Sequence, residues 1–311
     1  MGNLDPGRPV PQLTAPPPDS PRTLEPPVEA GGVRVYRDVV FANEIGYRPL
    51  RMDILVPVLA GTARDEPVPV TLWLHGGGFL MGSRRRGDLS GPPWDALLAR
   101  GIAVAVVEYR FAFEAPFPAC VHDVKAAVRW LRARAGELGI DGERIAAWGE
   151  SAGGHLAELL GLTMDDPALE GGIGVTGPPS RVCAVVAWYA PSDLPAMAAD
   201  TGTDPMDPDT REARLLGAPP PIVPDAAAEA SPITHISRGA PPFLLLHGAA
   251  DHLVPCVQSE RLHSALQETG LNAELRVYPA ADHMWSGSPG AAQQALQQTT
   301  DALTRWLEPG R

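Results

Sequence analysis

The chain has 311 residues, of which 44% are apolar, and a formal net charge of −12 at pH 7. This apolar content is enough to bury one large core, which excludes a fibrous or wholly disordered protein. The negative charge would repel phosphate backbones and anionic lipid head groups, so it argues against nucleic acid or a membrane surface as a partner. The cysteines are too far apart for a zinc cluster and odd in number for a disulfide framework: Cys120, Cys183 and Cys256.

The printed sequence shows neither a membrane-spanning pattern nor a secretory-signal pattern. No run reaches the roughly 18 apolar residues that a membrane span needs, and the N-terminus lacks the basic and then apolar layout of a secretory signal. We therefore expect no membrane span and a cytoplasmic protein. The sequence leaves open whether the chain forms a homodimer.

The first 32 residues are dense in proline and poor in large apolar side chains, as in PVPQLTAPPPDSPRTLEPPVEAGG. Such a composition cannot build a core. We predict an extended or disordered arm over residues 1–32, followed by one catalytic domain over residues 33–311.

Strand-like and helix-like patterns alternate through that domain. The first two predicted strands carry polar residues and lie close together, like an antiparallel hairpin at a sheet edge, whereas the later ones are short apolar runs typical of strands buried on both faces. The eight predicted strands cover residues 33–42, 50–57, 69–75, 102–110, 144–149, 182–189, 242–248 and 273–279. Helical patterns cover residues 119–135, 152–162, 257–269 and 291–307.

This alternation predicts an α/β fold with a mainly parallel eight-stranded sheet and helices on both faces. Residues 193–241 break the rhythm, because prolines surround a single short helical piece at residues 210–216. We predict that residues 193–241 form a cap or insertion over the carboxyl edge of the sheet, where ligands bind in such folds; a solvent-exposed connection without a role is the alternative.

A serine lies in a tight turn between a predicted strand and a predicted helix. In the sequence AAWGESAGGHLAELLGL, Ser151 is flanked by Gly149 and Gly153 in G-x-S-x-G spacing. Small neighbours allow a sharp turn that projects the hydroxyl beyond the strand end, and the following helix directs its positive end at the reaction centre. Ser151 is the candidate nucleophile.

A serine nucleophile needs a base, and the base needs a carboxylate that orients it. Asp251 follows the strand PFLLLHG, and His283 follows the strand AELRVYP, which gives the chain order serine, aspartate, histidine. Asp282 and Asp193 are rival acids. His247 and His252 are rival bases, but they belong to the region that should supply the acid, which favours a structural role.

A glycine-rich loop follows another buried strand, in the sequence LWLHGGGFLMGS. Backbone N–H groups in such a loop can converge on the oxyanion of a tetrahedral intermediate. We assign the oxyanion donors to Gly77, Gly78 and Ala152. A flexible turn and a phosphate-binding loop are the alternatives, but the glycine-lysine pattern of a phosphate loop is missing.

The motif HGGGF at residues 75–79, the pentad at residues 149–153, Asp251 and His283 together resemble the α/β-hydrolase carboxylesterases of the hormone-sensitive-lipase type. The stretch FPACVHDVKAAVRWLRARAGELGIDGERIAAWGESAGGHLAELLG is similar to bacterial relatives described as feruloyl or acetyl esterase-like. The resemblance covers about residues 33–307 and implies an α/β-hydrolase fold. The sequence EYRFAFEAPFP at residues 108–118 departs from that family's usual pattern, as do the arm and the cap segment.

These features favour a serine hydrolase that cleaves short-to-medium acyl or aryl esters through an acyl-enzyme, without a metal or other cofactor. The same groups would suit an amide, a formamide, a lactone, or an elimination or cyclisation step, and a non-catalytic ligand-binding relative is the third alternative. We expect the small-molecule ester to contact apolar side chains beside the catalytic loops: Phe79, Leu80, Met81, Trp188, Tyr189, Met284 and Trp285.

Overall fold

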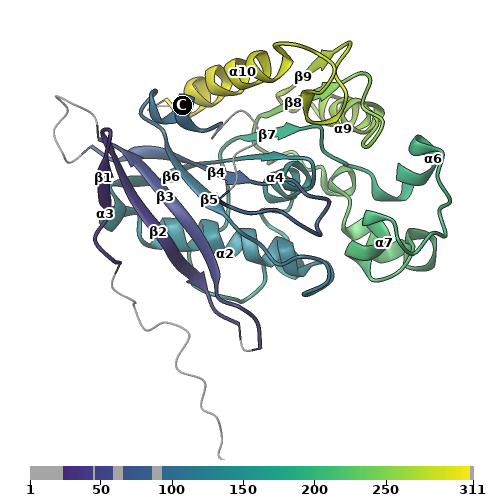
Figure 1. Ribbon diagram of the computed structural model, residues 1–311. Coiled ribbons are helices and arrows are strands. Elements are labelled where there is room, and N and C mark those ends of the chain that lie inside the picture. The colour runs from purple at the N-terminus through teal and green to yellow at the C-terminus, as the bar shows by residue number, and fades with distance from the viewer. Residues whose placement is uncertain (1–23, 45, 59–65, 86–92, 309–311) are drawn as a thin grey trace, which may run out of the picture.

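A single twisted sheet organises the molecule (Figure 1). The computed structural model describes residues 24–44, 46–58, 66–85 and 93–308. Within these residues the sheet has nine strands in the order β1-β2-β3-β5-β4-β6-β7-β8-β9. The strands are β1 (Val28–Ala30), β2 (Val33–Ala42), β3 (Leu50–Pro57), β4 (Val68–Leu74), β5 (Ala103–Val107), β6 (Ile140–Glu150), β7 (Val185–Trp188), β8 (Phe243–Gly248) and β9 (Ala273–Tyr278).

The first three strands pair in antiparallel fashion, and β3 is antiparallel to β5, whereas β5, β4 and β6 to β9 are parallel. The predicted hairpin of residues 33–42 and 50–57 is confirmed as β2 and β3. The described part of the sheet has one strand more than the eight predicted, because Val28–Ala30 pairs with β2 inside the predicted arm. Residues 1–23 of that arm lie outside the described residues.

The sheet is buried on both faces because its parallel strands alternate apolar side chains between two cores. In β5, Ala103, Ala105 and Val107 belong to one core, and Val104 and Val106 belong to the other. This arrangement explains why the central strands appear in the sequence as continuous apolar runs rather than as alternating patterns.

The helices cover these two cores. Helices α2 (Ala119–Ala133), α4 (Ala152–Leu162) and α9 (Val257–Glu268) bury side chains in the first core, whereas α1 (Asp95–Leu98) and α10 (Ala291–Trp306) pack on the second. Figure 1 shows α10 above the sheet and α2 below it. The two short helices α3 (Ala135–Leu138) and α5 (Pro167–Glu170) follow α2 and α4.

The segment 193–241 holds more helix than the one short piece predicted. It contains α6 (Met197–Thr201), α7 (Arg211–Leu216) and α8 (Pro224–Glu229), and the 3₁₀ turns η1 (Leu194–Ala196), η2 (Pro220–Ile222) and η3 (Pro232–His235). The helical piece predicted at residues 210–216 is α7. The other pieces are too short to show a helical period in the sequence, and four of them carry proline in their first turn, which is compatible with a helix start. In Figure 1, α6 and α7 lie at the end of the sheet away from β1.

The parallel strands bring four loops to one edge of the sheet. The loops that follow β4, β6, β8 and β9 leave from the carboxyl ends of parallel neighbours, so the residues predicted to carry chemistry emerge on the same side. None of the helices in the described ranges is both long enough and apolar enough to cross a bilayer.

Candidate active site

Ser151 occupies a strained turn between β6 and α4. Its backbone has φ 51° and ψ −120°, a conformation that a non-glycine residue rarely adopts. A Cβ on Gly149 would lie 2.1 Å from the carbonyl oxygen of Gly153, and a Cβ on Gly153 would lie 2.1 Å from that of Leu74. The two glycines of the G-x-S-x-G pattern are therefore required by backbone crossings at this turn.

The three residues of the proposed triad form a chain of hydrogen bonds. The Nε2 atom of His283 lies 3.1 Å from the Oγ of Ser151, and its Nδ1 lies 2.7 Å from Oδ2 of Asp251. Ser151 opens α4, Asp251 follows β8, and His283 begins the 3₁₀ turn η4 (His283–Trp285) after β9. The fold thus brings together three side chains that are separated by 132 and 32 residues in the sequence.

Asp251 is buried and fully engaged. Its Oδ1 accepts hydrogen bonds from the backbone N–H groups of Leu253 at 2.9 Å and Val254 at 2.8 Å, while Oδ2 faces His283. Burial acts to raise the pKa of this carboxyl, but its contacts with His247 and His283 outweigh burial, and the pKa lies below its ordinary value. Asp251 is therefore held as a carboxylate.

A second histidine lies behind Asp251. The Nε2 atom of His247 is 3.4 Å from Asp251 Oδ2 and 2.8 Å from the carbonyl oxygen of Val254, and its Nδ1 is 2.7 Å from the Oγ of Ser259. Both His247 and Ser259 are buried. With Ser259 donating to Nδ1, the imidazole presents an N–H toward Val254 and Asp251.

The rival acids and base have other partners. The carboxylate of Asp193 lies 3.3 Å from Arg261. Asp282 accepts the backbone N–H groups of His283 at 2.7 Å and His252 at 3.0 Å, so it caps the loop rather than facing the imidazole of His283. The side chain of His252 is exposed and lies 3.4 Å from Asp282.

The HGGG loop packs directly against the nucleophile turn. A Cβ on Gly76 would lie 3.3 Å from the Cβ of Ser151. The N–H of Gly76 donates to Oε1 of Glu150 at 3.3 Å, and the hydroxyl of Tyr109 donates to the carbonyl of His75 at 2.8 Å. The loop is thus tied to the turn by glutamate and to the sheet by tyrosine.

The proposed oxyanion donors lie on this loop and at the start of α4. The carbonyl of Gly77 accepts the N–H groups of Leu80 at 3.1 Å and Met81 at 3.2 Å, so the chain turns back on itself there. Gly77 and Gly78 have φ values of 129° and 60°, which favour glycine. Ala152 is the first residue of α4, where backbone N–H groups lack a partner within the helix.

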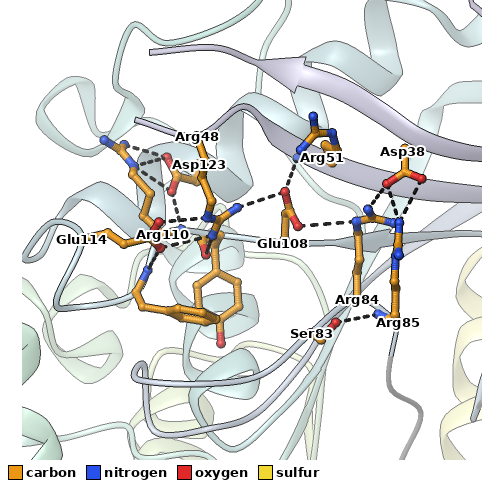
Figure 2. Close-up of polar contacts among 12 residues, drawn as sticks. Asp38, Arg48, Arg51, Ser83, Arg84, Arg85, Glu108, Arg110, Glu114 and Asp123 are labelled. Atoms are coloured by element: carbon orange, nitrogen blue, oxygen red, sulfur yellow. Dashed lines mark hydrogen bonds and ion pairs between the residues drawn. The ribbon is translucent and has the colours of Figure 1, made fainter. Parts of the chain in front are cut away.

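A buried arginine anchors the far end of the same loop (Figure 2). The guanidinium of Arg84 pairs with the carboxylates of Asp38 and Asp53, and lies 3.4 Å from Glu108. Glu108 also lies 3.0 Å from Arg48. Because Asp38, Asp53 and Glu108 lie on or beside β2, β3 and β5, this network fixes the residues after the HGGG motif to the antiparallel edge of the sheet.

The seven predicted pocket residues separate into two groups. Four of them are buried, pack against other rings and build the core beneath the site: Phe79, Trp188, Tyr189 and Trp285. The hydroxyl of Tyr189 also donates to Oε2 of Glu150 at 3.0 Å, and its ring lies 4.7 Å from that of His283. The side chains with exposed surface are Leu80, Met81 and Met284.

Sequence reasoning missed two contacts of the site and anticipated a third. His247 lies in the predicted strand that precedes Asp251, but nothing in the sequence indicates that it supports the carboxylate. Arg84 comes directly after the glycine-rich loop, yet its partners lie 31 and 46 residues away. The position of Glu150 next to the nucleophile favours a contact role in the loops, and its carboxylate accepts the N–H of Gly76. Across the described residues, no group of three or more His, Cys, Asp and Glu side chains is arranged to bind a metal ion.

Solved structures resemble this chain over most of its length. A "truncated form of carbohydrate esterase from gut microbiota" is 28% identical with a TM-score of 0.78, and the match covers 91% of this chain and 99% of that one. Esterase 2 of Thermogutta terrifontis, "phosphonylated by sarin", is 26% identical with a TM-score of 0.72 and covers 91% and 99%. The fold is that of the α/β-hydrolase esterases, as the sequence predicted.

The named sequence relatives are also described as esterases. "Probable carboxylic ester hydrolase LipM" of Mycobacterium tuberculosis is 32% identical over 277 residues, which are 85% of this chain and 61% of LipM. The chain thus spans less than two thirds of this relative. A family model described as BD-FAE matches residues 52–266, which include most of β3, the strands β4 to β8, Ser151 and Asp251. On this match, the chain belongs to the BD-FAE family of α/β-hydrolases.

Proposed function

We propose that this protein hydrolyses carboxylic esters, with Ser151 as nucleophile, His283 as general base and Asp251 as the carboxylate that orients His283. The observation that carries this proposal is the contact chain from Ser151 Oγ to His283 Nε2 at 3.1 Å and from His283 Nδ1 to Asp251 at 2.7 Å. Names of relatives and structural neighbours that describe esterases support the choice of the ester bond.

The reaction follows from this geometry in two stages. His283 Nε2 accepts the proton of Ser151 as Oγ attacks the acyl carbon, and the protonated imidazole then gives that proton to the leaving alkoxide. Water, deprotonated by the same nitrogen, then attacks the acyl-enzyme, and the imidazolium returns this proton to Ser151 Oγ as the bond to the acyl carbon breaks and the acid leaves. Asp251 stabilises the charged imidazole in both stages, because its carboxylate faces Nδ1.

The developing oxyanion would be bound by the backbone N–H groups of Gly77, Gly78 and Ala152. The loss of one such donor costs about 3 kcal/mol of transition-state stabilisation in serine hydrolases, on the order of a hundredfold in rate. The contact of Gly76 with Glu150 and the ion pairs of Arg84 hold the loop before substrate arrives. Stabilisation of the oxyanion requires donors that are held in place in this way.

The test is to replace Ser151 by alanine and to measure hydrolysis of 4-nitrophenyl acetate and butyrate. We expect the variant to lose activity and to escape labelling by a fluorophosphonate, while the wild type reacts at Ser151. Full activity in the folded variant would overturn the proposal. If Ser151 is labelled but no simple ester is cleaved, the substrate would instead be an amide, a lactone or another acyl compound.

A further inference from the structure

A cavity of about 210 Å³ lies between the cap segment and the loop that carries Asp251. Its walls come from α7, through Arg211 and Glu212, and from the prolines of η2. The lining also includes Leu253, two residues after Asp251. This volume is below the range of about 300–1,000 Å³ typical of sites for drug-sized ligands, so the cavity suits one small group of a substrate.

The side chain of Arg211 connects this cavity to the proposed oxyanion loop. A Cβ built on Gly78 would lie 2.5 Å from Cδ and 2.7 Å from Nε of Arg211, so the arginine stem lies against the glycine itself. Arg211 also lines the cavity. A substrate whose ester carbonyl reaches Gly78 therefore has Arg211 as an immediate neighbour.

The guanidinium of Arg211 has no carboxylate within ion-pair distance in the described part of the chain. By contrast, Arg214 of the same helix lies 2.6 Å from Asp209, and both side chains are exposed. A guanidinium without an ion pair beside the proposed oxyanion loop offers a planar set of donors that matches a carboxylate in a bidentate arrangement.

Among the described residues, the other charged side chains of the cavity wall form no ion pair with Arg211. Burial raises the pKa of the Glu212 carboxyl, although the charge of Arg211 acts to lower it. Asp204 is exposed and accepts the backbone N–H of Met206 at 2.9 Å, and His252 lies 3.4 Å from Asp282. Arg211 is thus the group of this wall that is free to meet an anion.

We propose that Arg211 makes the site selective for esters that carry a carboxylate close to the scissile bond, with the carboxylate bound at Arg211 in the cap cavity. The inference rests on the proposed ester hydrolysis and adds the substrate class. The carboxylate can belong to the acyl group, as in a dicarboxylic hemiester, or to the alcohol, as in an esterified hydroxy acid.

The test compares charged substrates with neutral substrates of the same shape. For the alcohol side, these are 4-acetoxybenzoate and 4-acetoxybenzamide; for the acyl side, ethyl hemisuccinate and ethyl succinamate. Acid release gives kcat/KM for each. We expect the wild type to prefer the anionic member of at least one pair by about tenfold, the scale of one charge-assisted contact, and the preferred pair identifies the side that Arg211 binds.

Three variants assign this preference to the guanidinium. Arg211→Gln should lower kcat/KM for the preferred anionic ester about tenfold and leave its neutral partner within about twofold. Arg211→Lys should restore part of the preference, because it returns the charge without the planar fork. Arg214→Gln, on the same helix, is the matched control and should leave both members unchanged.

The result that overturns the inference is equal hydrolysis of both members of both pairs by the wild type, or a preference that Arg211→Gln retains. Either result leaves ester hydrolysis itself intact, because the neutral esters are then cleaved. Failure of the proposed function has a different signature, in which neither charged nor neutral esters are cleaved and Ser151 is not labelled by the fluorophosphonate.

Discussion

The imidazole of His247 lies 3.4 Å from the same Oδ2 atom of Asp251 that contacts His283 at 2.7 Å. We predict that His247→Gln lowers kcat about tenfold and leaves KM within about twofold, because Asp251 would lose one of the groups that fix its orientation, and small displacements of catalytic groups are costly. Steady-state kinetics on 4-nitrophenyl acetate, with circular dichroism as a check on folding, measure this effect.

Ser259→Ala is the control for His247. It removes the hydroxyl at Nδ1 and leaves the Nε2 contacts with Val254 and Asp251 in place, so we expect a smaller loss of kcat than in His247→Gln. A His247→Gln protein with lower thermal stability and unchanged kcat would mean that His247 only supports the fold.

Glu150 links the nucleophile turn to the oxyanion loop, because its two carboxylate oxygens accept the N–H of Gly76 and the hydroxyl of Tyr189. Glu150→Ala should lower kcat about tenfold, less than the loss of a donor itself, because the loop would no longer be held in place. Tyr189→Phe removes only the second contact and should cost less. If Glu150→Ala keeps the wild-type kcat, the loop is fixed by its other contacts.

Gly153 lies where α4 crosses the end of β4. A Cβ there would be 2.1 Å from the carbonyl oxygen of Leu74 and 2.5 Å from that of His75, and both are backbone atoms that cannot move aside cheaply. We predict that Gly153→Ala lowers the free energy of unfolding by about 3 kcal/mol or more, as measured by urea denaturation.

Gly136→Ala provides the comparison for Gly153. A Cβ on Gly136 has no atom within 4 Å, and the residue belongs to α3, so the substitution should be neutral or stabilise by up to about 1 kcal/mol. Equal urea midpoints for Gly153→Ala and the wild type would contradict the backbone crossing.

The strand pattern and the position of the proposed triad could be predicted because both depend on local sequence. The predicted strands at residues 33–42 and 50–57 match β2 and β3 residue for residue. Ser151, Asp251 and His283 each follow an apolar run, and in a parallel sheet the carboxyl ends of such strands meet at one edge.

The remaining features depend on contacts between distant parts of the chain. Phe79, Trp188 and Trp285 were predicted to line the pocket because they lie near the catalytic loops. Their side chains point into the two cores instead, and a position in a strand, turn or loop does not fix that direction from the sequence. Arg211 lies against Gly78, which is 133 residues earlier in the chain. The sequence predicts the short helix at residues 210–216 but not the contact that this helix makes. The strand β1 was not predicted, because Val28–Ala30 lies in a proline-rich segment and its pairing with β2 is a tertiary contact.

Two buried histidines give the stability of the protein a predictable dependence on pH. Burial lowers the pKa of His75 and of His155 to about 4, from an ordinary value of 6.5. Both are neutral in the folded protein at pH 5, whereas in the unfolded chain they take up protons below about pH 6.5. Stability is therefore complete above that value and is lost as the pH falls toward about 4, by about 2 kcal/mol per histidine between pH 7 and pH 5.

His155→Gln isolates one of these two contributions. The His155 ring contacts the carbonyl of Pro191 through Nδ1 at 2.7 Å, and a glutamine amide can donate to the same oxygen without titrating. Urea denaturation at pH 7 and pH 5 should show a loss of stability that is about 2 kcal/mol smaller in the variant than in the wild type. If the variant loses as much stability as the wild type over this interval, protonation of His155 does not accompany unfolding, and the acid sensitivity comes from other groups.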